Sequence, residues 1–223
     1  MTFQSKRLAQ IPPYLFAKIN QRKKELMAQG VDIIDLGIGD PDLPTPSHIV
    51  EKLREELNDP ANFKYSPFQG ISEFREAVAS FYKQQYDVEL DPETEVLTLI
   101  GSKEGIAHII PALADEGDYI LIPDPGYPVY RMAASLANVH TYGLPLTPSN
   151  HFQPEWDQIP EEMLQKAKLI FLNYPSNPTT ATVDLSFFEE AVRFAKKRHI
   201  PIAHDSAYHL ITFDGYKAPS ILQ

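Results

Sequence analysis

Cysteine is absent from the 223 residues. The chain therefore forms no disulfide framework, no thiolate metal site and has no cysteine nucleophile, although this absence does not fix the compartment. Basic residues are the minority, with 20 Lys and Arg against 30 Asp and Glu and a net charge of −10. A surface of that sign repels polyanions overall. We therefore predict no nucleic-acid partner, while a local anion site is compatible with this charge.

Long apolar runs are also missing. Residues 1–16 contain Lys6 and Arg7 but then Pro12 and Pro13 in place of a continuous apolar core, so they do not resemble a signal peptide. No later run is long enough to cross a bilayer. We expect a cytoplasmic protein without a membrane partner, and we predict no metal site.

The residues that are present describe a globular protein, with 43% hydrophobic and 22% charged residues. Strand and helix patterns alternate from about residue 93 onward. The expected strands are 96–100, 119–122, 139–144, 169–172 and 200–204, and the expected helices between them are 103–114 capped by Ser102, 129–136, and one capped by Asp184. This alternation predicts an α/β fold with a mainly parallel sheet and helices on both faces. Earlier in the chain we expect helices at 14–29, after Ser47 and at 71–85, with a short strand at 33–36.

Asp205 follows the last predicted strand, and Tyr208 comes three residues later. In open α/β sheets the carboxyl ends of the strands border the ligand crevice. A buried carboxylate there needs a positive or hydrogen-bonding partner. The alternative is that Asp205 caps the turn that follows.

Three other loops follow predicted strands and lie at the same edge if the strands are parallel. Residues 101–105 (GSKEG) open a helix, whose free N–H groups favour a phosphate, although such a segment is also an ordinary turn and cap. Residues 123–128 (PDPGYP) hold Tyr127, which either stacks on a flat ring or only fills space. Residues 173–179 (NYPSNPT) either direct the Asn177 amide into the cleft or form an ordinary loop. Together these groups suit a phosphorylated aromatic cofactor with a basic ring nitrogen and a ring hydroxyl.

Six motifs cover essentially the whole chain, at residues 37–42 (GIGDPD), 65–70 (YSPFQG), 101–104 (GSKE), 124–127 (DPGY), 173–179 (NYPSNPT) and 205–208 (DSAY). In this order they resemble the fold-type I pyridoxal-phosphate aminotransferases of the class I/II group, in a branch similar to LL-diaminopimelate aminotransferase. The resemblance implies the large domain of that fold, pyridoxal 5′-phosphate as cofactor, and transfer of an amino group between an amino acid and a 2-oxo acid.

The resemblance also implies roles for individual residues. Asp205 would pair with the protonated pyridine nitrogen and keep the ring an electron sink. Asn177 and Tyr208 would hydrogen-bond the ring hydroxyl, and Tyr127 would stack on the ring face.

The phosphate would be held by the backbone amides of Ser102 and Lys103. Tyr65 would reach the same phosphate from the neighbouring subunit, so the resemblance implies a homodimer. Gly39, which has no side chain, would let its backbone approach the substrate α-carboxylate.

The chain departs from this pattern in the Schiff-base lysine. The family has this lysine in a Ser-x-Ser-Lys context well beyond the aspartate motif, and the chain ends at Gln223 without it. Lys217 is the only lysine after Asp205, and we interpret it as a solvated loop lysine because it lacks that context. The arginine that binds the substrate α-carboxylate is absent too, so we predict no catalytic residue within the chain. In addition, Thr180 stands where the family usually has Gly.

We therefore expect the N-terminal part of an aminotransferase, with residues 1–45 as an arm and small-domain segment and residues 46–223 as an incomplete large cofactor-binding domain. The leading substrate is LL-diaminopimelate, as in lysine biosynthesis, and an aspartate- or alanine-type enzyme is the alternative. Another hypothesis is a truncated protein that binds pyridoxal phosphate without catalysis. A dinucleotide-binding domain is the third, but Gly37-Ile38-Gly39 is followed by Asp-Pro-Asp and not by a helix with a third Gly.

Overall fold

The computed structural model describes residues 3–11, 15–37, 39 and 41–223. The chain divides into two compact units, residues 12–68 and residues 1–11 together with 69–223. The predicted boundary between residues 1–45 and 46–223 stays a prediction. The expected helix start at Tyr14, and two positions of the 37–42 motif, Ile38 and Asp40, lie outside the described residues.

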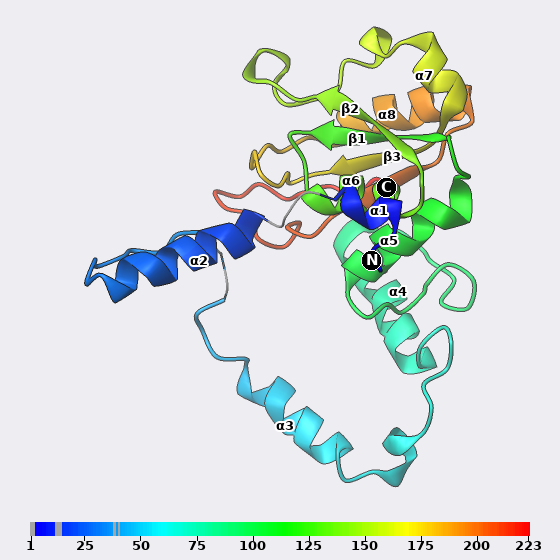
Figure 1. Ribbon diagram of the computed structural model, residues 1–223. Coiled ribbons are helices and arrows are strands. Elements are labelled where there is room, and N and C mark those ends of the chain that lie inside the picture. Colours follow the sequence, from blue (N-terminus) through cyan, green and yellow to red (C-terminus); the bar gives the residue numbers. More distant parts are fainter. Residues whose placement is uncertain (1–2, 12–14, 38, 40) are drawn as a thin grey trace. The chain divides into compact units, whose positions relative to one another are not determined.

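Four parallel strands form the centre of the larger unit (Figure 1). They are β1 (Tyr119–Asp124), β2 (His140–Pro145), β3 (Ala167–Asn173) and β4 (Ile202–Asp205). Their order is β2-β1-β3-β4, and every neighbouring pair is parallel. The predicted parallel sheet is confirmed, and the carboxyl ends of all four strands lie at one edge.

The larger unit also contains several helices. In the larger unit they are α1 (Lys6–Ala9), α4 (Ser72–Tyr86), α5 (Ser102–Leu113), α6 (Pro128–Leu136), α7 (Glu161–Lys166) and α8 (Leu185–Arg198), with the 3-10 turns η2 (Pro148–Asn150) and η3 (Trp156–Gln158). None of the helices in the described part of the chain combines the length and the apolar character needed to cross a bilayer.

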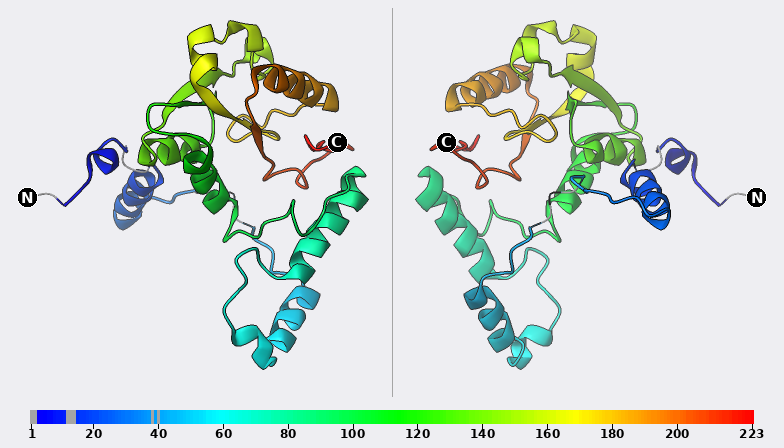
Figure 2. Two further views of the ribbon diagram at one scale, coloured as in Figure 1. Left: turned by 90° about the vertical axis from the view of Figure 1, so that its right-hand side faces the viewer. Right: turned by 90° about the vertical axis from the view of Figure 1, so that its left-hand side faces the viewer.

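Side chains of each strand alternate between the two faces of the sheet and build two cores. From β3, Leu169 and Phe171 pack in the core that includes residues of α5 and α6. Ile170 and Leu172 face the opposite core, which includes residues of α7 and α8. Figure 2 shows α8 on one side of the sheet and α5 with α6 on the other. The predicted coverage of both faces is therefore confirmed.

Trp156, the only tryptophan of the chain, lies in the core on the α8 side. It is 6% exposed, and its ring stacks on Phe194 of α8 with the centroids 4.9 Å apart. A second ring of α8, Phe187, lies at 6.3 Å. Stacked rings add to the free energy of area burial, so this cluster anchors η3 to α8.

Two predicted strands are wrong. Residues 33–36 and 96–100 are irregular, although their apolar residues suggested strands. A strand is stable only when a neighbouring strand shares its ladder of hydrogen bonds, and neither segment belongs to the described sheet. The backbone of residues 96–100 is instead held where Thr98 N donates to Gln69 O at 3.1 Å, and the side chains of Leu36 and Ile100 are exposed.

Helix starts were predicted with mixed success. Asp184 caps α8 as expected, because its Oδ1 accepts from Phe187 N at 3.1 Å. Ser102 and Ser47 are not caps but the first residues of α5 and α3. The N-cap of α5 is Gly101 with a φ of 77°, a conformation that glycine adopts without strain.

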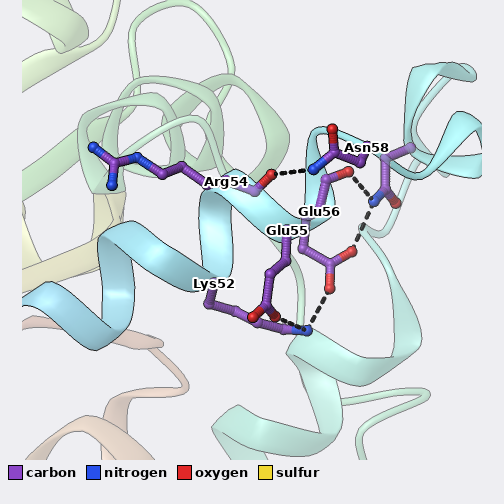
Figure 3. Close-up of polar contacts among 6 residues, drawn as sticks. Lys52, Arg54, Glu55, Glu56 and Asn58 are labelled. Carbon is purple, nitrogen blue, oxygen red and sulfur yellow. Dashed lines mark hydrogen bonds and ion pairs between the residues drawn. The ribbon is translucent and has the colours of Figure 1, made fainter.

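The smaller unit contains α2 (Leu15–Ala28), α3 (Ser47–Glu56) and the 3-10 turn η1 (Pro60–Phe63). Side chains tie the end of α3 to the segment that follows it (Figure 3). Asn58 Nδ2, beyond the helix, donates to Arg54 O at 2.9 Å, and within α3 Lys52 Nζ pairs with Glu56 Oε1 at 2.6 Å. Exposed pairs of this kind contribute little to stability, so their effect is to define the turn after α3.

Candidate active site

The loops that the sequence singled out leave the sheet at its carboxyl edge. Because β1, β3 and β4 are parallel, Tyr127, Asn177 and Tyr208 all follow strands that end at this edge. The larger unit therefore brings three of the predicted cofactor-binding residues to one side of the sheet.

The amino-terminal end of α5 is directed toward the same edge. Leu113, the last residue of α5, lines a surface hollow with Ala167 and Pro201. Ala167 begins β3, and Pro201 directly precedes β4, so α5 ends at the amino edge of the sheet. The first residues of α5 consequently lie toward the carboxyl edge.

Ser102 and Lys103 are these first residues, and their backbone N–H groups have no acceptor among the described residues. Gly101 contributes no side-chain cap. Glu104 turns back instead and accepts a hydrogen bond from Ile100 N. The start of α5 thus keeps free donors and the positive end of its dipole, which together can bind an anion.

Asp205 is the last residue of β4, and its side chain is half-buried. Its Oδ2 accepts a hydrogen bond from Tyr130 OH at 2.7 Å. Tyr130 lies on α6, is completely buried, and stacks on Phe171 with ring centroids 4.7 Å apart. Burial, and after it the negative charge of Asp205, raise the pKa of Tyr130 above its ordinary value. The hydroxyl therefore stays protonated and serves as a donor.

The other carboxylate oxygen of Asp205, Oδ1, has no hydrogen-bond partner within the described part of the chain. Nor does any backbone N–H of those residues donate to the carboxylate, so the alternative role of Asp205 as a cap of the following turn is not observed. One oxygen is held by the protein and the other is available to a cation.

Asn173, the last residue of β3, connects this carboxylate-bearing strand to the loop after β3. It is 3% exposed. Its Nδ2 donates to Asp205 O at 2.8 Å, and its Oδ1 accepts from Asn177 N at 2.7 Å. The amide therefore uses its N–H donor on the Asp205 segment and its oxygen acceptor on the Asn177 segment.

Asn177 and Tyr208 come together although 31 residues separate them, because Asn177 Nδ2 donates to Tyr208 OH at 3.2 Å. Both side chains remain partly exposed. A hydrogen-bonded amide and phenol at the edge of a crevice can share one acceptor atom of a ligand.

Tyr127 directly precedes α6 as its N-cap residue. Its ring meets the ring of Tyr130 edge to face, with centroids 5.8 Å apart and planes at 83°. The ring is half-buried, so Tyr127 packs against the protein on one side and keeps exposed surface on the other.

His204, the neighbour of Asp205 in β4, provides a second link to the loop after β3. Its Nε2 lies 3.0 Å from Tyr174 O, and with a carbonyl as partner this nitrogen donates. The ring also packs on Phe188 of α8 at 4.6 Å. Burial lowers the pKa of His204 below its ordinary value, so the folded protein favours the neutral imidazole.

Two predicted residues, Tyr65 and Gly39, belong to the smaller unit and are exposed there. A Cβ added to Gly39 would meet nothing within 4 Å, so its backbone is open to approach. Their predicted roles stay predictions.

Residues 41–46 are irregular and α3 begins only at Ser47, so Gly39 is not directly followed by the helix that a dinucleotide site requires.

The sequence did not reveal Tyr130 or Asn173 as site residues. Tyr130 lies three positions after Tyr127, and this spacing places two side chains on one face of a helix. The spacing was the one signal that could have indicated Tyr130 as a neighbour of the site. Asn173 directly follows the predicted strand 169–172, but its contact with Asp205 depends on the strand register. Lys217 is exposed in an irregular segment, as a solvated loop lysine would be.

Comparison with known proteins identifies the relatives of this chain. The sequence model of the family "Aminotransferase class I and II" matches residues 31–222. LL-diaminopimelate aminotransferase of Moorella thermoacetica is 52% identical over 220 residues, covering 99% of this chain and 56% of the relative. The enzyme of the same name from Aquifex aeolicus is 52% identical over 219 residues, covering 98% and 57%.

Among solved structures, a substrate-bound BacF structure from Bacillus subtilis is similar over 100% of this chain and 56% of that chain, with a TM-score of 0.93 and 41% identity. The chain thus spans little more than half the length of the relatives that it matches.

Proposed function

Because the chain belongs to the class I and II aminotransferase family, as its six motifs predicted, we propose that the full-length protein containing it is an aminotransferase. It moves the amino group of LL-diaminopimelate, an intermediate of lysine biosynthesis, to a 2-oxo acid. The identity of about half of all aligned residues to LL-diaminopimelate aminotransferases supports this substrate over aspartate or alanine. We also propose that this enzyme is located in the cytoplasm.

The chemistry of the donor set fits pyridoxal 5′-phosphate, the cofactor of this family. The observation that carries the proposal is the Asp205 carboxylate, with one oxygen held by Tyr130 and the other free, at the edge toward which α5 begins. That arrangement suits a molecule with a cationic ring nitrogen at one end and a phosphate at the other. When bound, the cofactor supplies an electron sink for the substrate Cα.

The residues of this chain then hold and orient the ring. Asp205 would accept a charge-assisted hydrogen bond from the protonated pyridine nitrogen, which keeps its proton, and Tyr130 would maintain the orientation of the carboxylate. Asn177 and Tyr208 would hydrogen-bond the ring hydroxyl, and their own hydrogen bond of 3.2 Å supports this shared role. Tyr127 covers one ring face with the surface that it leaves exposed.

The phosphate is held by the free N–H groups of Ser102 and Lys103 at the start of α5. In the proposed assembly Tyr65 reaches the phosphate of the neighbouring subunit, so the active protein is a homodimer. Gly39 lets its backbone approach the α-carboxylate of the substrate. The lysine that bonds covalently to the cofactor is supplied by sequence beyond these residues, so the 223-residue chain alone is inactive.

The test uses the full-length protein with LL-diaminopimelate, aspartate and alanine as amino donors and a 2-oxo acid as acceptor. We expect the highest kcat/KM with LL-diaminopimelate. We expect Asp205→Asn to lower it about 10- to 100-fold, since a hydrogen bond to a charged group contributes about 1.5–3 kcal/mol. Asp157→Asn is the matched control and should retain activity, because it removes an exposed carboxylate that lines a surface hollow with residues of α8.

Full turnover by the Asp205→Asn protein would show that the role of Asp205 is wrong, and preference for aspartate or alanine would show that the substrate is wrong. Borohydride separates the non-catalytic alternative. An aminotransferase yields a covalent cofactor adduct, whereas a protein that only binds the cofactor noncovalently yields none.

A further inference from the structure

The side chain of Asn173 links the two segments that carry the proposed ring-binding groups. It donates to the backbone carbonyl of Asp205 and accepts from the backbone N–H of Asn177, at 2.8 and 2.7 Å. This side chain is buried, with only 3% of the residue exposed. Water is therefore a poor substitute for either partner.

The position of Asn173 explains why a side chain is needed for this link. The ladder between β3 and β4 ends at the pair Asn173 and Asp205. Beyond this pair the chain after β3 turns away into a loop that closes on itself, where Thr180 N donates to Ser176 O at 2.9 Å. Where the two backbones separate, the side-chain amide of Asn173 takes the place of the ladder and hydrogen-bonds to both segments.

We propose that Asn173 is a positioning residue that fixes the distance between the Asp205 carboxylate and the Asn177 amide. This inference rests on the proposed function. The pyridoxal ring is rigid, so its nitrogen and its hydroxyl present two points at a constant separation, and the protein must hold their partners at a matching separation. A buried amide that bonds both backbones at once provides that spacing.

Two variants of the full-length protein separate the two hydrogen bonds. Asn173→Ala removes both of them. Asn173→Asp keeps the shape and the acceptor for Asn177 N–H but loses the donor and faces the carbonyl oxygen of Asp205. Tyr174→Phe is the matched control, because it removes an equally buried hydrogen bond, from Tyr174 OH to Phe152 O at 2.6 Å, that contacts neither Asp205 nor Asn177.

We expect Asn173→Ala and Asn173→Asp each to raise the dissociation constant of pyridoxal 5′-phosphate for the apoprotein on the order of tenfold. Since a hydrogen bond donated to the ring oxygen favours its ionised form, the pH midpoint of the bound cofactor's visible absorption should rise as well. Amide hydrogen exchange of residues 174–181, measured without cofactor, should accelerate in the alanine variant. Tyr174→Phe should lower the unfolding temperature without changing cofactor affinity or the pH midpoint.

The inference is overturned if both Asn173 variants bind the cofactor with unchanged affinity and an unchanged pH midpoint, because Asn173 then only stabilises the fold. If the alanine variant does not fold, the isosteric aspartate variant decides between these outcomes. Failure of the proposed function looks different, since the unmodified protein would then show neither a visible cofactor band nor a borohydride adduct.

Discussion

Replacing Thr180 with glycine should stabilise the protein. Thr180 has a φ of 59° and an exposed side chain, and its N–H donates to Ser176 O at 2.9 Å. This backbone conformation is strained for a β-branched residue. The loop after β3 therefore carries a local cost at the position where the family usually has Gly.

The magnitude follows from two opposing contributions. The left-handed conformation costs an L-residue about 1–2 kcal/mol. Glycine loses about 0.5–1 kcal/mol because its unfolded chain has more freedom. Since the Thr180 side chain makes no hydrogen bond among the described residues, its removal gives up little, and the net gain in the free energy of unfolding is about 0.5–1 kcal/mol. In the full-length protein, of which this chain spans little more than half, that gain corresponds to about 1–2 °C in Tm.

Thermal unfolding of the full-length protein at fixed concentration measures this gain. Asn138→Gly is the matched control, because Asn138 has the same φ of 59° but asparagine tolerates the left-handed region. Asn138→Gly should therefore change the Tm of the protein less than Thr180→Gly does. The reasoning about strain is refuted if Thr180→Gly lowers Tm, or if Asn138→Gly raises it by as much.

Two further predictions concern buried polar groups. Tyr130→Phe removes the donor to Asp205 and should lower the free energy of unfolding of the apoprotein by about 1–3 kcal/mol, measured by urea unfolding; an unchanged midpoint would show that the hydrogen bond adds nothing. Burial lowers the pKa of His204 from 6.5, so as the pH falls below this value the unfolded chain takes up the proton first and stability is lost. His204→Gln, which keeps a donor for Tyr174 O, should therefore lose less stability between pH 7 and pH 5, and an equal loss would contradict the assignment.

The sheet could be predicted because its signals are local. β1, β3 and the segment that leads into β4 are short apolar runs, and the helices between the strands repeat apolar residues at the helical period. The segment 96–100 shows the limit of that signal, because an apolar run predicts a strand whether or not a partner strand lies beside it. The cap of α5 shows another limit, since side-chain preference favours Ser102, whereas the turn requires the positive φ that Gly101 adopts.

The candidate site was predicted at the level of loops and not of contacts. Asp205, Asn177 and Tyr208 could be proposed because their residue types suit a known chemistry and they follow predicted strands. Tyr130 and Asn173 could not, because their bonds to Asp205 span 75 and 32 positions of the chain. Such pairs depend on the register of β3 with β4 and on how α6 packs over the sheet.

Because Trp156 is buried, its fluorescence reports on the α8 side of the sheet and not on the opposite side. Its indole is stacked against α8, on the side of the sheet opposite α5 and α6. Its emission wavelength will therefore follow the opening of the α8 side to solvent, and rearrangements confined to the side of Tyr130 will leave its contribution to the spectrum unchanged.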